Sequence, residues 1–329
     1  MKVLITGHRG YIGCHAVDVF QRAAHQVTGV DIGYFDDCSF EQRTLANVEI
    51  TADVANLTLE QISGHDVIIH LAAISNDPMG ELDERLTMHT NVDATLHLAK
   101  LAKQAGVSRF VFASSCAVYG DSQGVAADEN HAVAPQTAYA RSKIIAEQAL
   151  LEMDADGFTV CILRNATAYG HSPALRTDLV FNDFVAGLAI NNCVHLLSDG
   201  EACRPLVHCR DIAYAFLNVA EADLMSIAGE IFNVGNAEQN IKVVDLARLV
   251  CAAQPDSELS FSTQASPDQR DYWVDFTKIS AKVPNFATRY SLSTEANYLL
   301  NSCLQQQDFA DKQLKGRFSR LRQIKKQLD

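Results

Sequence analysis

Short apolar runs alternate with stretches of helical periodicity through the first half of the chain. The first run, KVLIT at 2–6, ends at glycines and precedes a helical stretch at 11–24. Later apolar runs lie at 26–31, 48–53, 66–73, 108–115 and 159–165, with helical stretches at about 83–105 and from Tyr139 onward. Continuous apolar strands separated by helices are typical of a parallel sheet covered on both faces. We therefore predict an α/β fold with a doubly wound parallel sheet.

The regular alternation of apolar runs and helical stretches is interrupted after Arg164. Residues 166–206 look irregular apart from a helix near 179–190, whereas 205–222 and 230–235 again resemble strand, helix and strand. We predict one domain over 1–165 with a return segment at about 206–236. The rest of 166–329 then forms an interwoven C-terminal lobe.

Composition excludes several classes of partner. Forty acidic and 27 basic residues give a net charge of −13, which argues against nucleic acid because phosphate backbones select basic surfaces. The last eighteen residues are basic; we expect a solvated helix there, with an anion-binding tail as the alternative. Nine cysteines lack metal-ligand spacing, so we expect no metal site. No apolar run reaches the ~20 residues that span a bilayer, and the N-terminal run is too short for a signal peptide. We therefore expect a cytoplasmic protein that does not bind membranes.

Three glycines, Gly7, Gly10 and Gly13, follow the first strand and open the first helix. Such glycines let a pyrophosphate approach the helix N-terminus, where free amide groups favour anions. Asp31 ends the second strand, where a carboxylate accepts from the adenosine ribose hydroxyls. Arg9 within the loop would instead suit the 2′-phosphate of NADP. Because Asp31 would repel that phosphate, the sequence favours NAD.

A possible proton-transfer pair lies in the segment TAYARSK. Tyr139 and Lys143 stand four residues apart on a predicted helix, which places both side chains on one face. A nearby cation stabilises a phenolate and makes tyrosine usable as a base. Ser115 ends the preceding strand, at the sheet edge where doubly wound folds bind ligands. No Gly-x-Ser-x-Gly elbow surrounds this serine, so we do not expect a hydrolase nucleophile.

These motifs occur together with HLAA, SSCAVYG, LRNATAYG, RPLVHCRDIA and FNVG, in this order. The sequence thereby resembles the extended short-chain dehydrogenase/reductases, and within them the nucleotide-sugar epimerase/dehydratase branch typified by UDP-galactose 4-epimerase. The resemblance covers about residues 1–280. It implies that 1–165 is a Rossmann domain that binds NAD and that 166–329 binds a nucleotide-diphosphate sugar. It also implies a homodimer.

The resemblance assigns roles to individual residues. It implies that Ser115 hydrogen-bonds the reacting sugar oxygen, that Tyr139 exchanges its proton, and that Lys143 binds the nicotinamide ribose. It implies that Arg204 clamps the substrate diphosphate. The other implied cofactor contacts are Gly7, Arg9, Gly10, Tyr11, Ile12, Gly13, Asp31, Asp53, Val54, Leu71, Ala72, Ala73 and Asn91. The other implied substrate contacts are Ser75, Asn76, Asn165, Asn182 and Arg270.

Cys116 marks a departure from part of this family. The 4,6-dehydratases carry an Asp-Glu pair after the catalytic hydroxyl residue, whereas this chain has Cys116-Ala117. We therefore predict a nucleotide-sugar epimerase, acting at C4 through a transient 4-keto sugar. The alternatives are a 4-keto-sugar reductase, an atypical dehydratase in which Cys116 transfers a proton, and an NAD-sensing module without activity. Thr167 and the segment AISNDP also differ from the galactose enzyme, which leaves the sugar and the nucleotide base open.

Overall fold

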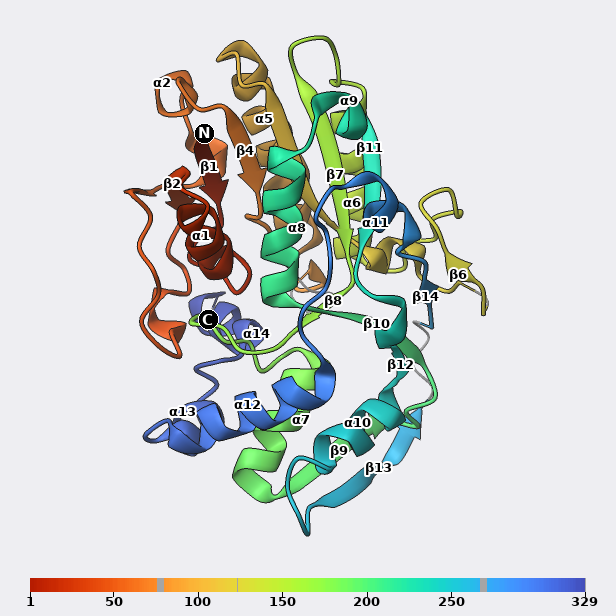
Figure 1. The fold of residues 1–329 in the computed structure, drawn as a ribbon. Helices are drawn as coiled ribbons and strands as arrows, with labels where there is room; N and C mark the ends of the chain where they lie inside the picture. The colour runs from red at the N-terminus through yellow and green to blue at the C-terminus, as the bar shows by residue number, and fades with distance from the viewer. Residues whose placement is uncertain (76–79, 123, 267–270, 329) are drawn as a thin grey trace.

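The centre of the protein is a seven-stranded parallel sheet with helices on both faces (Figure 1). The computed structural model describes residues 1–75, 80–122, 124–266 and 271–328. The strand order is β11-β7-β5-β4-β1-β2-β3, as predicted for a doubly wound fold. The strands are β1 (Lys2–Thr6), β2 (Gln26–Asp31), β3 (Val48–Thr51), β4 (Val67–His70), β5 (Arg109–Ser115), β7 (Thr159–Asn165) and β11 (Glu230–Val234).

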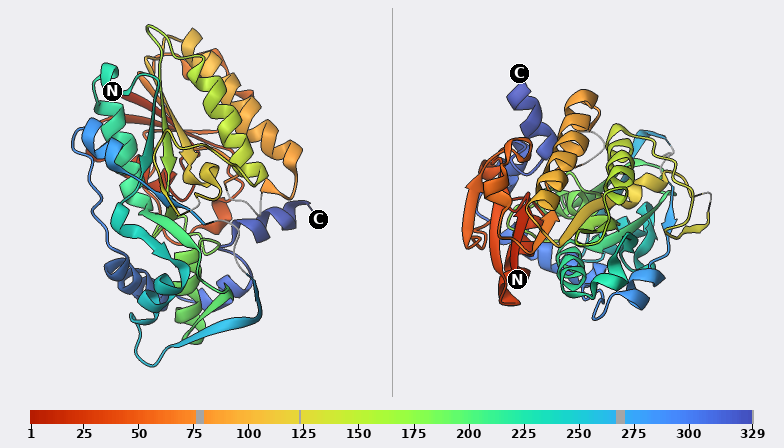
Figure 2. Two further views of the ribbon diagram at one scale, coloured as in Figure 1. Left: turned by 90° about the vertical axis from the view of Figure 1, so that its right-hand side faces the viewer. Right: turned by 90° about the horizontal axis from the view of Figure 1, so that it is seen from above.

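Helices α1 (Gly13–Arg22) and α8 (Cys209–Glu221) pack together on one face of the sheet, and α5 (Ala94–Gln104) and α6 (Ala138–Leu151) pack on the other (Figures 1 and 2). Side chains of β1 point alternately to the two faces of the sheet, so this strand contributes to the core on both faces. Val3 and Ile5 belong to the core with α1 and α8, whereas Leu4 belongs to the core with α5 and α6. Both faces are therefore covered, which accounts for the unbroken apolar strands.

The predicted helix at 83–105 is one helical stretch with a wider turn in its middle. It comprises α4 (Glu84–Met88), the π-helical turn η3 (His89–Asp93) and α5. Asn91 lies in that π-turn and is buried. π-turns inside α-helices often occur at functional sites.

The C-terminal lobe holds more regular structure than the sequence indicated. The stretch 166–206, predicted to be irregular, contains β8 (Thr167–Tyr169), β9 (Cys193–Ser198) and β10 (Cys203–His208) besides α7 (Val180–Asn191). That prediction was wrong because these strands are short and pair with distant segments: β9 with β13 (Glu258–Ser266) and β10 with β12 (Asn240–Lys242). Helices α10 (Val243–Cys251) and α12 (Leu292–Gln305) complete the lobe core with α7.

The chain passes back to the central sheet after the first strands of the lobe. Strand β10 pairs with β8 and β12 in a separate three-stranded sheet. Helix α8 packs on the central sheet, β11 pairs with β7, and the short helix α9 (Leu224–Ile227) contacts β7. A short strand, β6 (Ala126–Ala127), pairs with β14 (Trp273–Val274) and links the two parts again.

The basic C-terminus differs most from its prediction. It forms α13 (Phe309–Leu314) and α14 (Arg320–Leu328), and Arg320 at the start of α14 is buried. The expectation of a solvated helix was therefore wrong at this residue. Apolar neighbours such as Phe309 and Phe318 explain the error, because they anchor the segment in the lobe core. Within the described part of the chain, no helix combines the length and the apolar character that crossing a membrane requires.

Candidate active site

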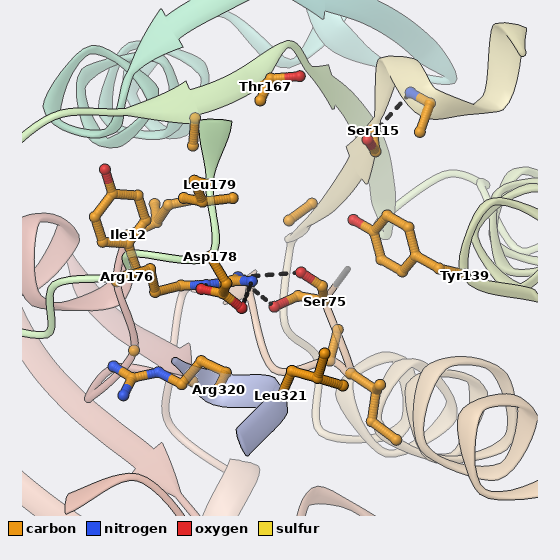
Figure 3. A pocket seen from close by; sticks show the side chains of 18 of the residues that line it. Ile12, Ser75, Ser115, Tyr139, Thr167, Arg176, Asp178, Leu179, Arg320 and Leu321 are labelled. Atoms are coloured by element: carbon orange, nitrogen blue, oxygen red, sulfur yellow. Dashed lines mark hydrogen bonds and ion pairs between the residues drawn. The ribbon is translucent and has the colours of Figure 1, made fainter. Parts of the chain in front are cut away.

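A cavity of about 1740 Å³ opens at the carboxyl ends of the parallel strands (Figure 3). Its wall takes residues from the ends of β1, β2, β4 and β5, from α6, from the lobe and from α14. Doubly wound sheets bind their ligands at this edge, because the loops there diverge. The cavity is large enough for a dinucleotide and a second ligand together, since single-ligand pockets measure ~300–1,000 Å³.

The glycine loop forms the floor of the cavity at the start of α1. Gly7 has φ of +69°, and a β-carbon there would lie 2.8 Å from the amide nitrogen of Ala72. A β-carbon at Gly13 would collide with the carbonyl oxygen of Gly7. Side chains are thus excluded and the helix N-terminus stays open to an anion. Tyr11 and Ile12 also line the cavity.

Asp31 lines the cavity, but Arg9 does not. The Asp31 carboxylate accepts from the backbone amides of Arg9 at 3.1 Å and Gly33 at 2.9 Å, which fixes its orientation. The Arg9 guanidinium instead donates to Asp36 at 2.8 Å and to Thr51 Oγ1 at 2.8 Å. Its charge is therefore compensated within the protein, which leaves Asp31 to set the charge at the ribose position. This arrangement fits NAD and disfavours a 2′-phosphate.

The remaining predicted cofactor residues fall into two groups. Asp53, Val54, Leu71, Ala72 and Ala73 all line the cavity. Asn91 stands behind the wall, where its amide accepts from the Ile74 amide at 2.9 Å and donates to Ser142 Oγ at 3.0 Å. Its position supports the wall and α6, rather than contact with a ligand.

Ser115, Tyr139 and Lys143 line one side of the same cavity. Figure 3 shows the Ser115 hydroxyl and the Tyr139 phenol extending into it from β5 and from α6. Lys143 Nζ donates to the Ala113 carbonyl at 2.8 Å and lies 5.7 Å from the centre of the Tyr139 ring. Burial lowers the pKa of Lys143 to about 7, against a smaller raising effect of Glu147. A lysine held so close to the phenol can stabilise its phenolate when protonated.

Cys116 follows Ser115 but lies in the opposite environment. It is fully buried in the core and does not line the cavity. Its thiol donates to the Arg164 carbonyl at 3.2 Å, and burial raises its pKa far above the usual value. Strand β5 ends at Ser115, whose hydroxyl lies toward the cavity, and Cys116 begins the 3-10 turn η4 (Cys116–Tyr119), where its side chain is buried in the core. The assignment of Cys116 to proton transfer is therefore not supported by its position, which is that of a packing residue.

The predicted substrate residues separate in the same way. Ser75, Asn165 and Arg204 line the cavity. Arg204 is nearly buried, donates to the Cys203 carbonyl at 2.7 Å and lies 5.6 Å from the Tyr272 ring centre. Asn165 donates to the Ser114 carbonyl at 3.1 Å, and its own carbonyl oxygen has no protein partner.

Asn182 is buried and does not line the cavity. It accepts from the Gly170 amide at 2.9 Å, and donates to Tyr11 Oη at 3.0 Å and to the Arg176 carbonyl at 2.8 Å. These bonds use its polar atoms to fasten the lobe to the glycine loop, so its prediction as a substrate contact does not match its position. Asn76 and Arg270 lie outside the described residues.

Arg176 and Arg320 are two of the three cavity-wall arginines that the sequence analysis missed, and the third is Arg322. The Arg176 guanidinium binds Ser75 through its side-chain and carbonyl oxygens at 3.0 and 3.1 Å, and it pairs with Asp178 at 3.1 Å (Figure 3). Arg320 reaches the wall from α14. Neither arginine belongs to a motif that the sequence analysis used, and the basic character of 312–326 was the only available signal for Arg320.

Comparison with known proteins agrees with this geometry. Residues 3–235 match the NAD dependent epimerase/dehydratase family. The chain is 28% identical over 322 residues to a protein of Bacillus subtilis described as an uncharacterized UDP-glucose epimerase, covering 91% of this chain and 98% of that one.

Two solved structures share the fold. An NAD-dependent NDP-hexosamine 5,6-dehydratase of tunicamycin biosynthesis superposes with a TM-score of 0.82 at 23% identity, covering 92% of this chain and 97% of the other. The UDP-glucuronic acid 4-epimerase of Bacillus cereus, solved with UDP-glucuronic acid and NAD, superposes with a TM-score of 0.76 at 23% identity, covering 92% of this chain and 98% of the other.

Proposed function

The chain belongs to the NAD dependent epimerase/dehydratase family, and from this premise we propose that it is a nucleotide-sugar epimerase that inverts C4. One observation carries the proposal. Ser115 and Tyr139 face the cavity while Cys116 faces the core. The site therefore offers a group for the hydroxyl proton at C4 and lacks, at the position after Ser115, the acid that dehydration would use.

NAD fits the residues present, because side chains are excluded at Gly7 and Gly13 and Asp31 stands at the ribose position. When bound, NAD supplies the acceptor and donor of a hydride. The protein supplies the proton chemistry: Ser115 orients the sugar hydroxyl and Tyr139 accepts its proton. Lys143 stabilises the phenolate, and the same tyrosine returns the proton after the keto sugar has turned.

Arg204 is proposed to hold the substrate diphosphate from the lobe side. Its fork geometry suits phosphate, and its near-complete burial makes an anionic partner favourable. Anchoring at the diphosphate leaves the sugar free to rotate, as epimerisation requires. A reductase would use the same residues but would need fresh reduced cofactor in every turnover.

The experiment is to isolate the protein, measure its retained NAD by mass spectrometry, and incubate it with UDP-, dTDP-, GDP- and CDP-sugars. We expect retained NAD and conversion of one substrate into its C4 epimer without added cofactor. A requirement for added NADH would favour the reductase. Loss of water from the sugar would favour the dehydratase.

The assembly and location follow from the family resemblance and are also proposals. We propose a cytoplasmic homodimer. Light scattering after gel filtration tests it: twice the chain mass of 36.0 kDa is expected. A monomer would refute the dimer without affecting the proposed chemistry.

A further inference from the structure

Arg320 is a buried cation that the protein itself leaves incompletely paired. It is only 3% exposed. Its Nη2 donates to the Ala174 carbonyl at 3.0 Å, and its guanidinium lies 4.8 Å from the centre of the Phe35 ring. Its Nη1 has no hydrogen-bond partner among the residues that the structure describes. Burying a guanidinium without an anion is costly, so a ligand that supplies negative charge would stabilise this arrangement.

The segment that carries Arg320 is packed firmly enough to position it. Phe309, Phe318 and Phe40 form an aromatic cluster with ring centres 5.5 to 6.1 Å apart. The Thr177 amide donates to the Phe318 carbonyl at 3.0 Å, and its hydroxyl donates to Gln313 at 2.9 Å. We call residues 309–328 the C-terminal arm. The arm is a wall of the cavity, which Ser319, Arg320, Leu321, Arg322 and Ile324 line.

The residues around Arg320 show that it lies at the end of the cavity formed by the glycine loop and the loop after Asp31. Phe35 belongs to the loop that follows Asp31, at the ribose position. The segment that accepts its hydrogen bond is tied to the glycine loop, because Ser172 donates to the Tyr11 carbonyl at 2.8 Å. In Figure 3 the Arg320 guanidinium points away from Ser115 and Tyr139. Arg320 thus stands with the cofactor loops, at the end remote from the proton-transfer residues.

We propose that Arg320 binds a phosphate of the diphosphate bridge of the dinucleotide, so that the C-terminal arm acts as a clamp on the cofactor. A guanidinium can donate two parallel hydrogen bonds to phosphate oxygens. The N-terminus of α1 at Gly10–Gly13, which lines the same cavity, favours the same anion through its free amide groups. A clamp of this kind keeps the cofactor in place between turnovers. The inference rests on NAD as the cofactor of the family and is independent of which sugar is converted.

The test compares Arg320→Met, which removes the charge and keeps the bulk, with Lys315→Ala. Lys315 lies on the same arm with a 72% exposed side chain, so its replacement removes an equal charge outside the cavity. The readouts are NAD content after gel filtration and dissociation constants of charcoal-treated protein for NAD, ADP-ribose, adenosine and UDP. We expect Arg320→Met to lose its NAD and to bind NAD and ADP-ribose about 10- to 100-fold more weakly. Adenosine and UDP binding should be unchanged, as should every value for Lys315→Ala.

The thermal unfolding midpoint of the cofactor-free protein is the control that each variant folds. Because Arg320→Met removes a buried charge that forms no ion pair within the described part of the chain, that midpoint should stay level or rise. Arg320→Lys keeps the charge without the fork, and its NAD affinity should be intermediate. Equal losses for adenosine and ADP-ribose, or a lower midpoint with unchanged NAD affinity in Arg320→Lys, would show a structural role and overturn the proposal. A loss for UDP alone would assign Arg320 to the sugar nucleotide and would overturn it as well.

Discussion

The two sides of the cavity are built in different ways. On the sheet side, Gly7, Gly13 and Asp31 come from adjacent parallel strands and their first turns, so the same short segments supply both fold and ligand contacts. On the lobe side, Arg176, Arg204 and Arg320 come from segments far apart in the sequence. The first side is local in sequence, and the second depends on how the lobe closes.

The difference extends to how charge is handled. Asp31 is held by the backbone amides of Arg9 in the glycine loop and of Gly33 in its own loop. Arg176 is neutralised by Asp178, whereas Arg320 keeps a nitrogen without a partner. Two guanidinium groups in one wall thus differ in their pairing: that of Arg176 forms an ion pair within the wall, and that of Arg320 is the one proposed to bind the cofactor phosphate. Substitutions on the two sides should therefore separate chemistry from binding.

The largest effect is expected on the sheet side, at Tyr139. Tyr139→Phe removes only the hydroxyl that exchanges the proton, so turnover should fall by a factor on the order of 10² or more, with NAD content unchanged. Steady-state kinetics and cofactor analysis measure both quantities. Tyr298→Phe is the matched control, since Tyr298 does not line the cavity and is 56% exposed. Near-normal turnover of Tyr139→Phe would contradict the assigned role.

Arg204 tests the lobe side. Arg204→Ala should weaken substrate binding by about 1.5–3 kcal/mol, the value of a charged hydrogen bond to phosphate, and should affect NAD less. Calorimetric titration with the nucleotide sugar gives the dissociation constant. Arg248→Ala removes an exposed arginine of the same lobe and should leave that constant unaltered. An unchanged constant for Arg204→Ala would remove this residue from the site.

Lys143 links the chemistry to stability. Its pKa is lowered by burial to about 7 in the folded protein, so between pH 7 and its unfolded value of ~10.4 the unfolded state binds the extra proton. The free energy of unfolding must therefore rise with pH above 7. Below pH 7 Lys143 is charged in the folded state as well, so the protein is destabilised by the full cost of burying that charge. Between pH 7 and 8.5 the free energy of unfolding should therefore increase by about 2 kcal/mol through the titration of Lys143.

Urea unfolding of cofactor-free wild type and Lys143→Met at several pH values isolates that contribution. The difference between the two proteins should be largest near pH 6–7, where Lys143→Met is the more stable, and should shrink toward pH 8.5 or above. A difference that does not vary with pH would show that Lys143 titrates near its ordinary value in the folded state.

Asp31 tests the cofactor preference set by the sheet side of the cavity. Asp31→Ala removes a ribose acceptor and the repulsion of a 2′-phosphate, so the preference for NAD over NADP should narrow by about tenfold, or ~1.4 kcal/mol. Fluorescence titration with both cofactors measures it. Tighter binding of NADP than NAD by the wild type would mean that Arg9, despite its acidic partners, dominates the pocket.

The smallest effect is expected at Cys116. Because its thiol is buried and points away from the cavity, Cys116→Ser and Cys116→Ala should change turnover by less than about twofold, with a loss of stability of about 1 kcal/mol from altered packing. Turnover and thermal unfolding are the measurements. Loss of turnover in both variants with intact NAD content would restore the dehydratase alternative.

The sheet side was predictable because its signals are periodic and local. Apolar runs identified every strand of the central sheet, and the spacing of Tyr139 and Lys143 placed both at one cavity. Asn182 and Cys116 could not be separated from ligand contacts in advance, because their direction depends on local backbone geometry and on partners such as Tyr11 and Arg164.

The lobe side was less predictable because its strands pair across long separations. Strand β9 pairs with the distant β13 and not with a strand that neighbours it in sequence, so no local pattern predicted it. Arg320 was hidden in a basic segment whose composition is that of a solvated helix. The burial of that segment depends on Phe309 and Phe318 meeting Phe40 of the central domain, a contact that composition does not reveal.

The most direct test of the central claim follows the hydrogen at C4. The substrate identified from the panel is prepared with deuterium at C4 and converted in ordinary water, and in parallel unlabelled substrate is converted in deuterium oxide. An epimerase that uses retained NAD should keep the label at C4 of the inverted product and introduce no solvent deuterium into the ring. Loss of the C4 label, or deuterium at C5 from the solvent, would contradict the account.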